Sequence, residues 1–330
     1  ITETFRVNDT ITVSGKAIAY AGSAISDAKV TYRVKRVLYF PRWYYWYRPY
    51  FNSTPQEITF GETTTDDAGN FKVAFKALPD TNTSAKDLPT FSYEVSADIT
   101  DINGETHSTT TTVNVGYHTL TANISVQNLL NKDINENKLQ LSTTNLNGQF
   151  APTKGTLKVY KLVAPTSVLR PRPWSAPDYD NFGKEKFKSL FPHDAYGSEH
   201  DVNTWEKGKL VWESNFDTKK EDVLSFPDMK KWESGAYTIE LEAKDKFGQL
   251  VQDKTQTNLF SDADKSLADN QLFSIQTDKT NYAIGDKVKV VLKSTAQDLK
   301  VTVTVEKNHK IIETQIIHLS NDSKSITIPV

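Results

Sequence analysis

The side chains best suited to acid–base or metal chemistry lie in one stretch, where His193 and His200 are close in sequence to Asp194, Glu199 and Asp201. Imidazole and carboxylate groups can exchange a proton or hold a zinc ion. The H-E-x-x-H spacing of zinc proteases is absent, as are the G-x-S-x-G elbow, the Walker loop and the dinucleotide fingerprint. We therefore expect no enzyme activity, no catalytic residue, no metal and no cofactor.

A second set of polar residues, Asp98, Asp101, Asn103 and Glu105, has the composition of a calcium-binding loop. The ligand order differs from that of an EF-hand, and the flanking residues alternate as in strands. Asp, Asn and Gly are also the residues that hairpin turns use for positive φ. We expect a hairpin turn here, and another at residues 66–70.

The densest feature of the chain is aromatic, with nine aromatic residues in the thirteen positions 39–51. Successive side chains of a strand point to opposite faces, so these residues cannot all enter one core. Three roles remain open, namely packing between domains, stacking on sugar rings or another ligand, and contact with a protein partner. The candidate interface or binding residues are Trp43, Tyr44, Tyr45, Trp46, Tyr47, Arg48 and Tyr50.

Composition restricts the class of protein further. The 330 residues carry 39 Lys and Arg against 41 Asp and Glu, a balance that argues against a nucleic-acid partner. Cysteine is absent, which excludes disulfides and favours a bacterial source.

The sequence contains no apolar run of about 18 residues, so it predicts no transmembrane helix. The chain opens with strand-like residues, so we expect a segment of a longer protein.

Hydrophobic periodicity predicts that the positioning elements are strands. In residues 1–117, apolar and polar side chains alternate over 30–35, 71–76 and 91–99, and a β-branched run at 109–115 closes the segment. Period two over many short runs is typical of half-buried strands. We therefore expect an all-β fold of tandem antiparallel β-sandwich domains, the first of which has about seven strands.

A second sandwich is expected at 118–258. It opens with alternating residues at 120–126 and closes with another alternating run at 237–243. Between them, a long insertion at about 164–205 is rich in proline, aromatic and charged residues, and 184–191 can form a short helix. Loops of this length in compact domains are often functional.

The remaining residues, 259–330, are expected to hold a polar linker at 261–269 and a partial third sandwich. A complete sandwich needs about seven strands, so this one is expected to be truncated or to close with fewer strands, leaving an exposed strand edge. The strands that fit are around 273–276, 287–293, 299–307, 311–317 and 325–330.

Several motifs resemble those of one protein family. Residues 282–288 read YAIGDKV, which is similar to the Tyr-x-x-Gly-Asp/Glu opening of macroglobulin domains. Residues 61–71 (GETTTDDAGNF), followed by 93–106 (YEVSADITDINGET), resemble bacterial alpha-2-macroglobulin-like proteins of the Bacteroidetes type, in which a Trp/Tyr-rich strand precedes this block. The resemblance implies macroglobulin-like sandwiches, similar to fibronectin-III domains.

Relatives in that family are long secreted or periplasmic chains, so the resemblance implies a bacterial protein that is periplasmic, secreted or on the cell surface. Many relatives trap proteases, using an exposed bait region and a thioester formed from Cys and Gln. A chain without cysteine cannot hold that thioester. The resemblance therefore implies a non-catalytic scaffold segment that packs against other domains of the same long chain and takes part in binding or inhibiting proteases. Within it, 164–205 is either an ordinary domain insertion or a bait. The alternative is a bacterial cell-surface module that binds glycan or protein through the aromatic residues at 43–50.

Overall fold

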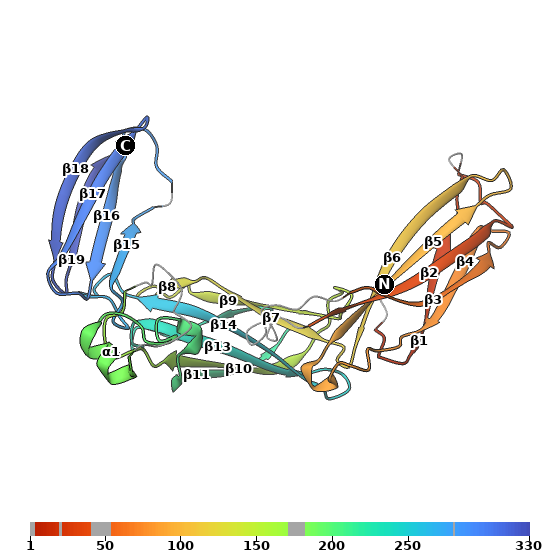
Figure 1. Cartoon of the computed structure of the whole chain (residues 1–330), viewed down its shortest axis with the longest axis horizontal. Helices are drawn as coiled ribbons and strands as arrows, with labels where there is room; N and C mark the ends of the chain where they lie inside the picture. Colours follow the sequence, from red (N-terminus) through yellow and green to blue (C-terminus); the bar gives the residue numbers. More distant parts are fainter. Residues whose placement is uncertain (1–3, 20–21, 41–53, 171–181, 280) are drawn as a thin grey trace.

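The computed structural model describes residues 4–19, 22–40, 54–170, 182–279 and 281–330. The candidate residues at 43–50 lie outside these ranges. The strands, numbered to β19, form tandem antiparallel β-sandwiches, which confirms the all-β fold class. Figure 1 shows three such units in an open arc, in which the first and third units rise on the same side of the second. Within the described part of the chain, no helix is long and apolar enough to cross a membrane.

The first unit packs a two-stranded sheet, β1-β4, against a four-stranded sheet, β3-β2-β5-β6. All of its strand pairs are antiparallel. A short 3-10 turn at Ala85–Asp87 lies in the connection from β4 to β5. The strands are β1 (Thr10–Lys16), β2 (Lys29–Tyr39), β3 (Gln56–Thr64), β4 (Asn70–Lys76), β5 (Thr90–Thr100) and β6 (Thr106–Gly116).

The second unit packs the sheet β12-β9-β7 against the sheet β11-β10-β13-β14-β8. The pairing of β8 with β14 is parallel, and the other strand pairs are antiparallel. The strands are β7 (Thr121–Val126), β8 (Leu129–Asn131), β9 (Lys138–Thr144), β10 (Lys154–Leu162), β11 (Lys207–Asp217), β12 (Val223–Ser225), β13 (Gly235–Lys244) and β14 (Leu250–Phe260).

The long insertion leaves the second unit between β10 and β11. It contains helix α1 (Lys184–Leu190), in agreement with the helix expected there, and a 3-10 turn at Val202–Thr204. An aromatic cluster holds the helix to the following turns, because the ring of Phe187 lies 5.2 Å from Phe191 and 5.4 Å from Tyr196. The described part of the insertion is therefore folded onto itself.

The third unit has five strands in two sheets, β15-β16-β19 and β17-β18. Its strands agree closely with the runs expected from the sequence. A two-residue turn joins β17 to β18, and Asn308 and His309 both have positive φ there (51° and 60°), as tight hairpins require. The strands are β15 (Phe273–Thr277), β16 (Lys287–Ser294), β17 (Leu299–Lys307), β18 (Lys310–Leu319) and β19 (Ser323–Pro329).

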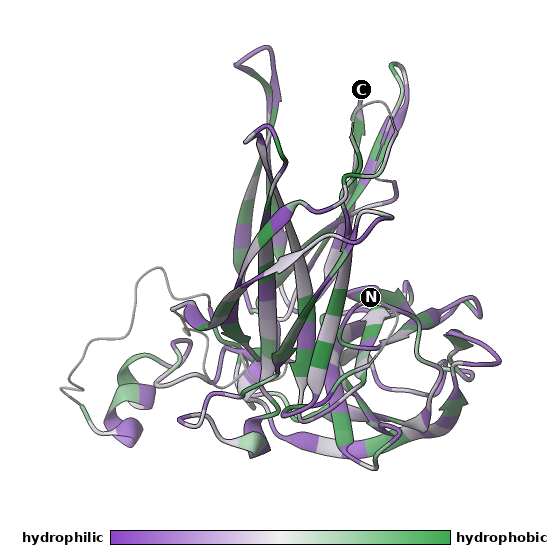
Figure 2. Ribbon diagram, turned by 90° about the vertical axis from the view of Figure 1, so that its right-hand side faces the viewer, coloured by the Kyte–Doolittle hydropathy of each residue, from purple (hydrophilic) through white to green (hydrophobic). Residues whose placement is uncertain are grey.

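Alternation along the strands is the reason that these residues form sandwiches. In β4, Phe71, Val73 and Phe75 are buried while the residues between them are exposed. Figure 2 shows the same change between polar and apolar residues along the strands of the molecule. Each sheet therefore offers one apolar face, and the faces pair around the buried clusters of the three units.

The turn at residues 101–105 joins β5 to β6 as a hairpin, as expected. The turn at 66–70 differs from its expectation. It joins β3 to β4, but these strands pair with β2 and β1 in opposite sheets, so the chain crosses between sheets at this point. The sequence of a turn specifies its local backbone and not the partner of the next strand.

Candidate functional site

The structure does not bring the candidate chemical residues of the insertion together. The Nδ1 atom of His193 lies 2.9 Å from the carbonyl oxygen of Val168, and the Asp194 carboxylate accepts two hydrogen bonds from Arg170. Among the residues that the structure describes, no group of three His, Asp or Glu side chains is placed to hold a metal ion. His193 and Asp194 thus fasten the end of the insertion to residues 168–170.

Among the described residues, four turns share one pattern, in which an Asx residue is followed by glycine three positions later. In each, the backbone N–H of the Asx residue donates to the carbonyl of the fifth residue, and its side chain accepts from the N–H groups of the third and fifth residues at 2.7–2.9 Å. The glycines have φ of 76–84°. The turns begin at Asp66, Asp101, Asn145 and Asp245.

Two of these turns connect the second unit to the first. Asp245 uses its other carboxylate oxygen, Oδ2, to accept from both the backbone N–H and the hydroxyl of Thr119, each at 2.9 Å, and thereby holds the connection from β6 to β7. The guanidinium carbon of Arg6 lies 4.4 Å from the ring centre of Phe247 in the same turn. Burial raises the pKa of Asp245, but the hydrogen bonds from Gln249, Phe247 and Thr119 outweigh it and lower the pKa overall.

The turn that begins at Asn145 holds the end of β6. Asn114 donates its backbone N–H to the side-chain oxygen of Asn147 at 2.8 Å and its side-chain amide to the carbonyl of Leu146 at 3.0 Å. Asn147 returns a hydrogen bond to the carbonyl of Asn114 at 3.2 Å. The sequence had not drawn attention to this turn, although its Asn-Gly pair is a recognisable signal.

His118 lies in the connection from β6 to β7 and is 3% exposed. Its Nδ1 atom is buried without a hydrogen-bond partner. Burial lowers the pKa of His118 to about 4, although the nearby Asp245 carboxylate opposes the shift. The imidazole is therefore neutral at pH 7, and a proton added to it would be an unsolvated charge between two units.

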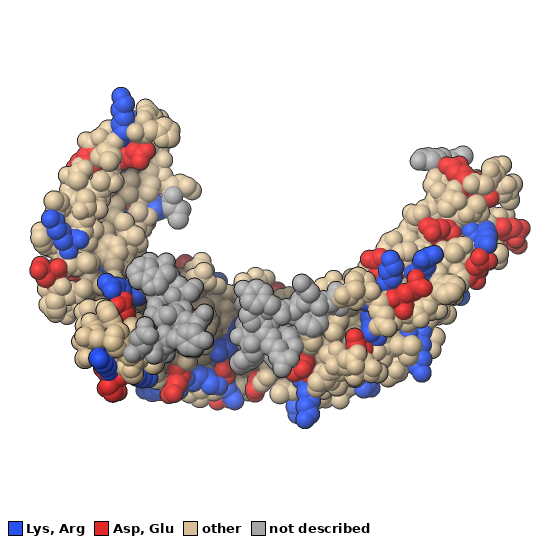
Figure 3. Space-filling model, in the orientation of Figure 1, with Lys and Arg blue, Asp and Glu red and all other residues tan. Residues whose placement is uncertain are grey.

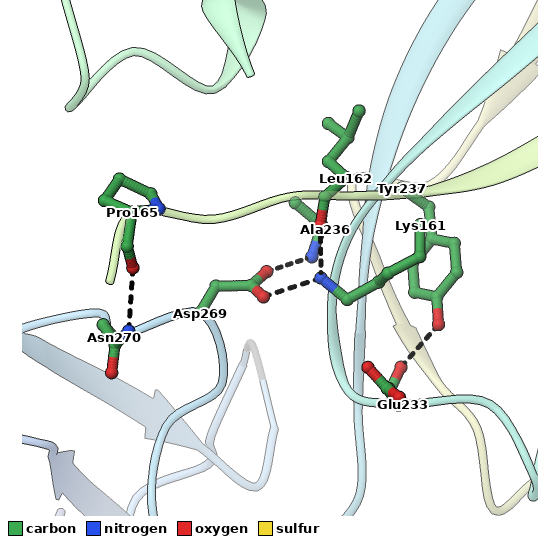
Figure 4. A network of polar contacts seen from close by, with 8 residues as sticks. All are labelled: Lys161, Leu162, Pro165, Glu233, Ala236, Tyr237, Asp269 and Asn270. Carbon is green, nitrogen blue, oxygen red and sulfur yellow. Dashed lines mark hydrogen bonds and ion pairs between the residues drawn. The ribbon is translucent and has the colours of Figure 1, made fainter. Parts of the chain in front are cut away.

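The second junction depends on a buried ion pair. The Nζ atom of Lys161 in β10 lies 2.6 Å from the Asp269 carboxylate, and the two side chains are 12% and 7% exposed. Asp269 also accepts the backbone N–H of Ala236 (Figure 4). Gly235 has a φ of 121°, and a Cβ there would collide with the carboxylate, so only glycine leaves room for it.

The residues expected as a polar linker, 261–269, are bonded to both units. Lys293 of β16 is 7% exposed and donates its ammonium to the carbonyl of Asp264 at 3.1 Å. The Asp264 carboxylate in turn accepts from Ser234 at 2.6 Å and from the backbone of Ser261 at 2.8 Å. The third unit is thereby joined to the second through several buried polar contacts.

The insertion reaches the same junction. Asn270 donates its side-chain amide to the carbonyl of Pro165 at 2.8 Å (Figure 4), and Leu169 forms a parallel bridge with Gln271. The start of the insertion and the residues directly after the linker are thus held side by side.

Arg36 is a further residue that the sequence did not single out. It lies in β2 among core positions, is 7% exposed, and bonds to the carbonyl of Leu78 at 2.9 Å, to Gln56 at 2.6 Å and to Asp80 at 3.2 Å. The signal that could have found it is a basic residue at a core position of an alternating strand, because a buried charge requires partners.

Positive and negative side chains are mixed on one face of the described molecule. On the face shown in Figure 3, Lys and Arg side chains are interspersed with Asp and Glu, and neither charge forms a continuous patch. Nucleic-acid binding normally requires a basic stripe. The geometry is that of three sandwiches fixed to one another, with polar contacts concentrated at their junctions.

No protein-family model matches the chain, and no curated protein matches it. Among solved structures, the native conformation of Escherichia coli alpha-2-macroglobulin aligns with 100% of this chain and 20% of its own, at 13% identity and a TM-score of 0.33. Trypsin-activated E. coli alpha-2-macroglobulin aligns with 99% of this chain and 21% of its own, at 12% identity and a TM-score of 0.29. This chain thus spans about a fifth of those proteins.

A tetra-tandem repeat from the extending region of a large adhesion protein also aligns, with 99% of this chain and 64% of its own, at 13% identity and a TM-score of 0.25. Scores of this size do not assign the chain to either kind of protein. The fold class rests on the strands and sheets of the structure.

Proposed function

We propose that this chain is a non-catalytic scaffold segment of a secreted or periplasmic alpha-2-macroglobulin-like protein that binds or inhibits proteases. The observation that carries the scaffold role is the bonding at both junctions. Thr119 is bonded twice to Asp245, and Lys161 is paired with Asp269 in a nearly water-free position. Charged contacts that are sheltered from water hold their geometry better than exposed ones.

The protease-related part of the proposal is supported by the order of the macroglobulin-like motifs at 61–71, 93–106 and 282–288. Proteins that these motifs resemble combine serial sandwiches with a bait and a thioester. This chain has no cysteine, so a thioester of the parent protein has to lie outside these residues.

Limited proteolysis with several unrelated proteases tests the scaffold role, with the first cuts mapped by mass and the shape of the cut chain measured by small-angle X-ray scattering. A scaffold is expected to keep its shape after the first cuts. Early cutting within 164–205 by every protease, accompanied by a change of shape, would instead identify the insertion as a bait or sensor. Pro165 and Leu169 are bonded to Asn270 and Gln271, directly after the linker, so a cut that releases the insertion is expected to alter the shape at this junction.

A surface module that binds glycan or protein is the second candidate. One observation favours it: Tyr39, which is 51% exposed, and Phe40 line a groove of about 520 Å³ between the first two units, directly before the aromatic stretch. Its test is a fluorescence titration, in which soluble glycans are added and tryptophan emission is recorded for the unchanged chain and for Trp43→Ala and Trp46→Ala. Saturable quenching that both substitutions abolish would favour this candidate over the scaffold.

A further inference from the structure

The third unit meets the second where β15 begins and β16 ends (Figure 1), and one lysine at this place differs from the others of its strand. Lys287, Lys289 and Lys293 all belong to β16, but of these only Lys293 is buried, at 7% exposed. Its ammonium donates to the linker carbonyls of Ser261 at 3.4 Å and of Asp264 at 3.1 Å. The burial of Lys293 is therefore a feature of the junction.

Lys293 lacks the counter-ion that two other sheltered cations of the molecule have. Arg36 is paired with Asp80, and Lys161 is paired with Asp269. Among the described residues, no carboxylate forms an ion pair with Lys293, and its two carbonyl partners use two of the three N–H groups of an ammonium. A buried charge is costly unless it is paired. The third N–H of Lys293 is thus available to a negatively charged partner.

A second polar group beside Lys293 also has an unused donor. Ser274 of β15 is directly opposite Lys293 in the antiparallel pairing of β15 with β16, so the two side chains lie on the same face of the sheet. The hydroxyl oxygen of Ser274 is buried, and no described residue forms a hydrogen bond with it. Most buried side-chain polar atoms have a partner. An ammonium and a hydroxyl, both able to donate, are therefore neighbours at this junction.

Both side chains line one cavity of about 370 Å³ between the second and third units. Its volume is that of a small-molecule site, and such sites often form at domain interfaces. The second unit and the linker supply apolar walls, which include Leu129, Leu259, Phe260 and Leu267. The cavity thus combines apolar contact on one side with hydrogen-bond donors from the third unit.

The charges of the described lining residues restrict the ligand further. Lys293 is the one cation among them, and Asp264 is the one anion. The Asp264 carboxylate accepts from the Ser234 hydroxyl and from the backbone N–H of Ser261. A ligand with one negative charge is attracted by Lys293, whereas a second charge on the ligand would increase its repulsion by Asp264. A carboxylate meets this condition, because it accepts several hydrogen bonds with a single charge.

We propose that this cavity binds a small monocarboxylic acid with an apolar body, and that the bound acid fastens the third unit to the second. The carboxylate accepts from the Lys293 ammonium and the Ser274 hydroxyl, and the hydrocarbon part lies against Leu129 and Leu267. Because the walls come from both units, the acid binds the closed junction in preference to a loosened one and stabilises it. This inference is independent of any role toward proteases.

Titration of the chain with hexanoate, followed by NMR of the backbone amides, tests the site. Hexanol and hexylammonium carry the same apolar body without the negative charge, and sulfate carries two negative charges without the apolar body. The proposal expects saturable shifts in β15, β16 and the linker with hexanoate, and at least about tenfold weaker binding of the other three compounds. Equal binding of hexanol or sulfate, or no saturable shift at the junction, would overturn it.

Two lysine substitutions in one strand separate a specific site from general attraction to positive charge. Lys293→Met removes the buried ammonium but keeps a long side chain, and Lys289→Met is the matched control, because Lys289 is exposed in the same strand. Lys293→Met is expected to weaken hexanoate binding at least about tenfold, and Lys289→Met is expected to leave it unchanged. Equal weakening by both substitutions would overturn the site.

Thermal unfolding distinguishes loss of the ligand from loss of the fold. Replacing a buried charge by an apolar side chain is often neutral or stabilising, so Lys293→Met is expected to melt no lower than the unchanged chain without hexanoate. With hexanoate, the melting temperature is expected to rise in the unchanged chain and not in Lys293→Met.

If Lys293→Met does not fold, Ser274→Ala keeps the proposal testable, because it removes a single buried oxygen atom. This substitution is expected to weaken hexanoate binding about fivefold, and an unchanged affinity would overturn the role of the hydroxyl in the site.

Discussion

Individual buried charges stabilise this molecule only as complete pairs. Lys161 is enclosed by the Asp269 carboxylate, the carbonyl of Leu162 and the ring of Tyr237. Such a pair adds little to stability compared with apolar residues of the same size, but removing one partner leaves the other charge desolvated. Its effect is therefore seen best when a single partner is changed.

The Asp269→Asn substitution is expected to reduce the free energy of unfolding by roughly 3 kcal/mol, because the Lys161 ammonium loses its counter-ion in a nearly dry position. Urea unfolding followed by tryptophan fluorescence measures the change. Glu62→Gln is the matched control, since the Lys29–Glu62 pair is about 60% exposed on both sides and is expected to contribute less than about 1 kcal/mol. Equal effects of the two substitutions would contradict a buried pair that holds the junction.

His118 makes stability depend on pH in a definite direction. Its pKa is about 4 in the folded chain and near 6.5 in the unfolded chain, so its contribution is complete above pH 6.5 and is lost as the pH falls toward 4. The expected loss is about 3 kcal/mol over this window. Urea unfolding at pH 7.5 and pH 4.5 is compared for the unchanged chain and for His118→Gln. The difference gives the contribution of His118 to the pH dependence of stability, because Gln does not titrate. An equally steep pH dependence in His118→Gln would assign the effect to other groups.

At the scale of elements, the Asx–glycine turns share one backbone conformation but have two different structural roles. Those beginning at Asp66 and Asp101 connect strands within the first unit, while those at Asn145 and Asp245 also contact the first unit through Asn114 and Arg6. Each turn needs a glycine with positive φ. The cost of replacing that glycine depends on what surrounds it.

Gly69→Ala is expected to destabilise the first unit more than Gly104→Ala does. Both glycines have similar φ, 76° and 82°, so both substitutions introduce about 1 kcal/mol of backbone strain. A Cβ at Gly69 would also lie 2.5 Å from the carbonyl oxygen of Ala17, whereas nothing lies within 4 Å at Gly104. Overpacking adds roughly 1–3 kcal/mol at Gly69. Thermal unfolding of the two variants measures the difference, and equal melting temperatures would contradict it.

The elements were largely predictable from the sequence, and their contacts were not. Alternation identified the strands, because a half-buried strand repeats every two residues. The hairpin at Asp101 and helix α1 followed from local residue types. Arg36, His118 and the Lys161–Asp269 pair were missed because their partners are distant in sequence, up to 108 residues in the case of the ion pair. Local patterns carry no information about such pairings.

At the scale of the whole molecule, the open arc of Figure 1 depends on the two junctions, since the cores of the three units form separate clusters. Units joined by small polar interfaces are expected to move relative to one another unless specific contacts prevent it. At the first junction, the double hydrogen bond from Thr119 to Asp245 fastens the connection between β6 and β7 to the second unit and is such a contact.

The Asp245→Asn substitution is expected to loosen that junction while leaving its turn intact. Asn145 shows that asparagine supports the same turn, because its side-chain oxygen accepts the same two backbone hydrogen bonds. The oxygen that Thr119 now uses would become an amide nitrogen, which cannot accept its N–H. Small-angle X-ray scattering is expected to show a broader distribution of interatomic distances and an altered radius of gyration.

Asp101→Asn is the matched control for this experiment, because it alters the same kind of turn in a hairpin where Asp101 bonds within its own turn. Its scattering curve is expected to coincide with that of the unchanged chain. If Asp245→Asn also left the curve unchanged, the arc would be held by the remaining contacts of Asn114 and Arg6. If both variants changed it, the arc would depend on the folding of the turns in general, and the scaffold role would lose its support at this junction.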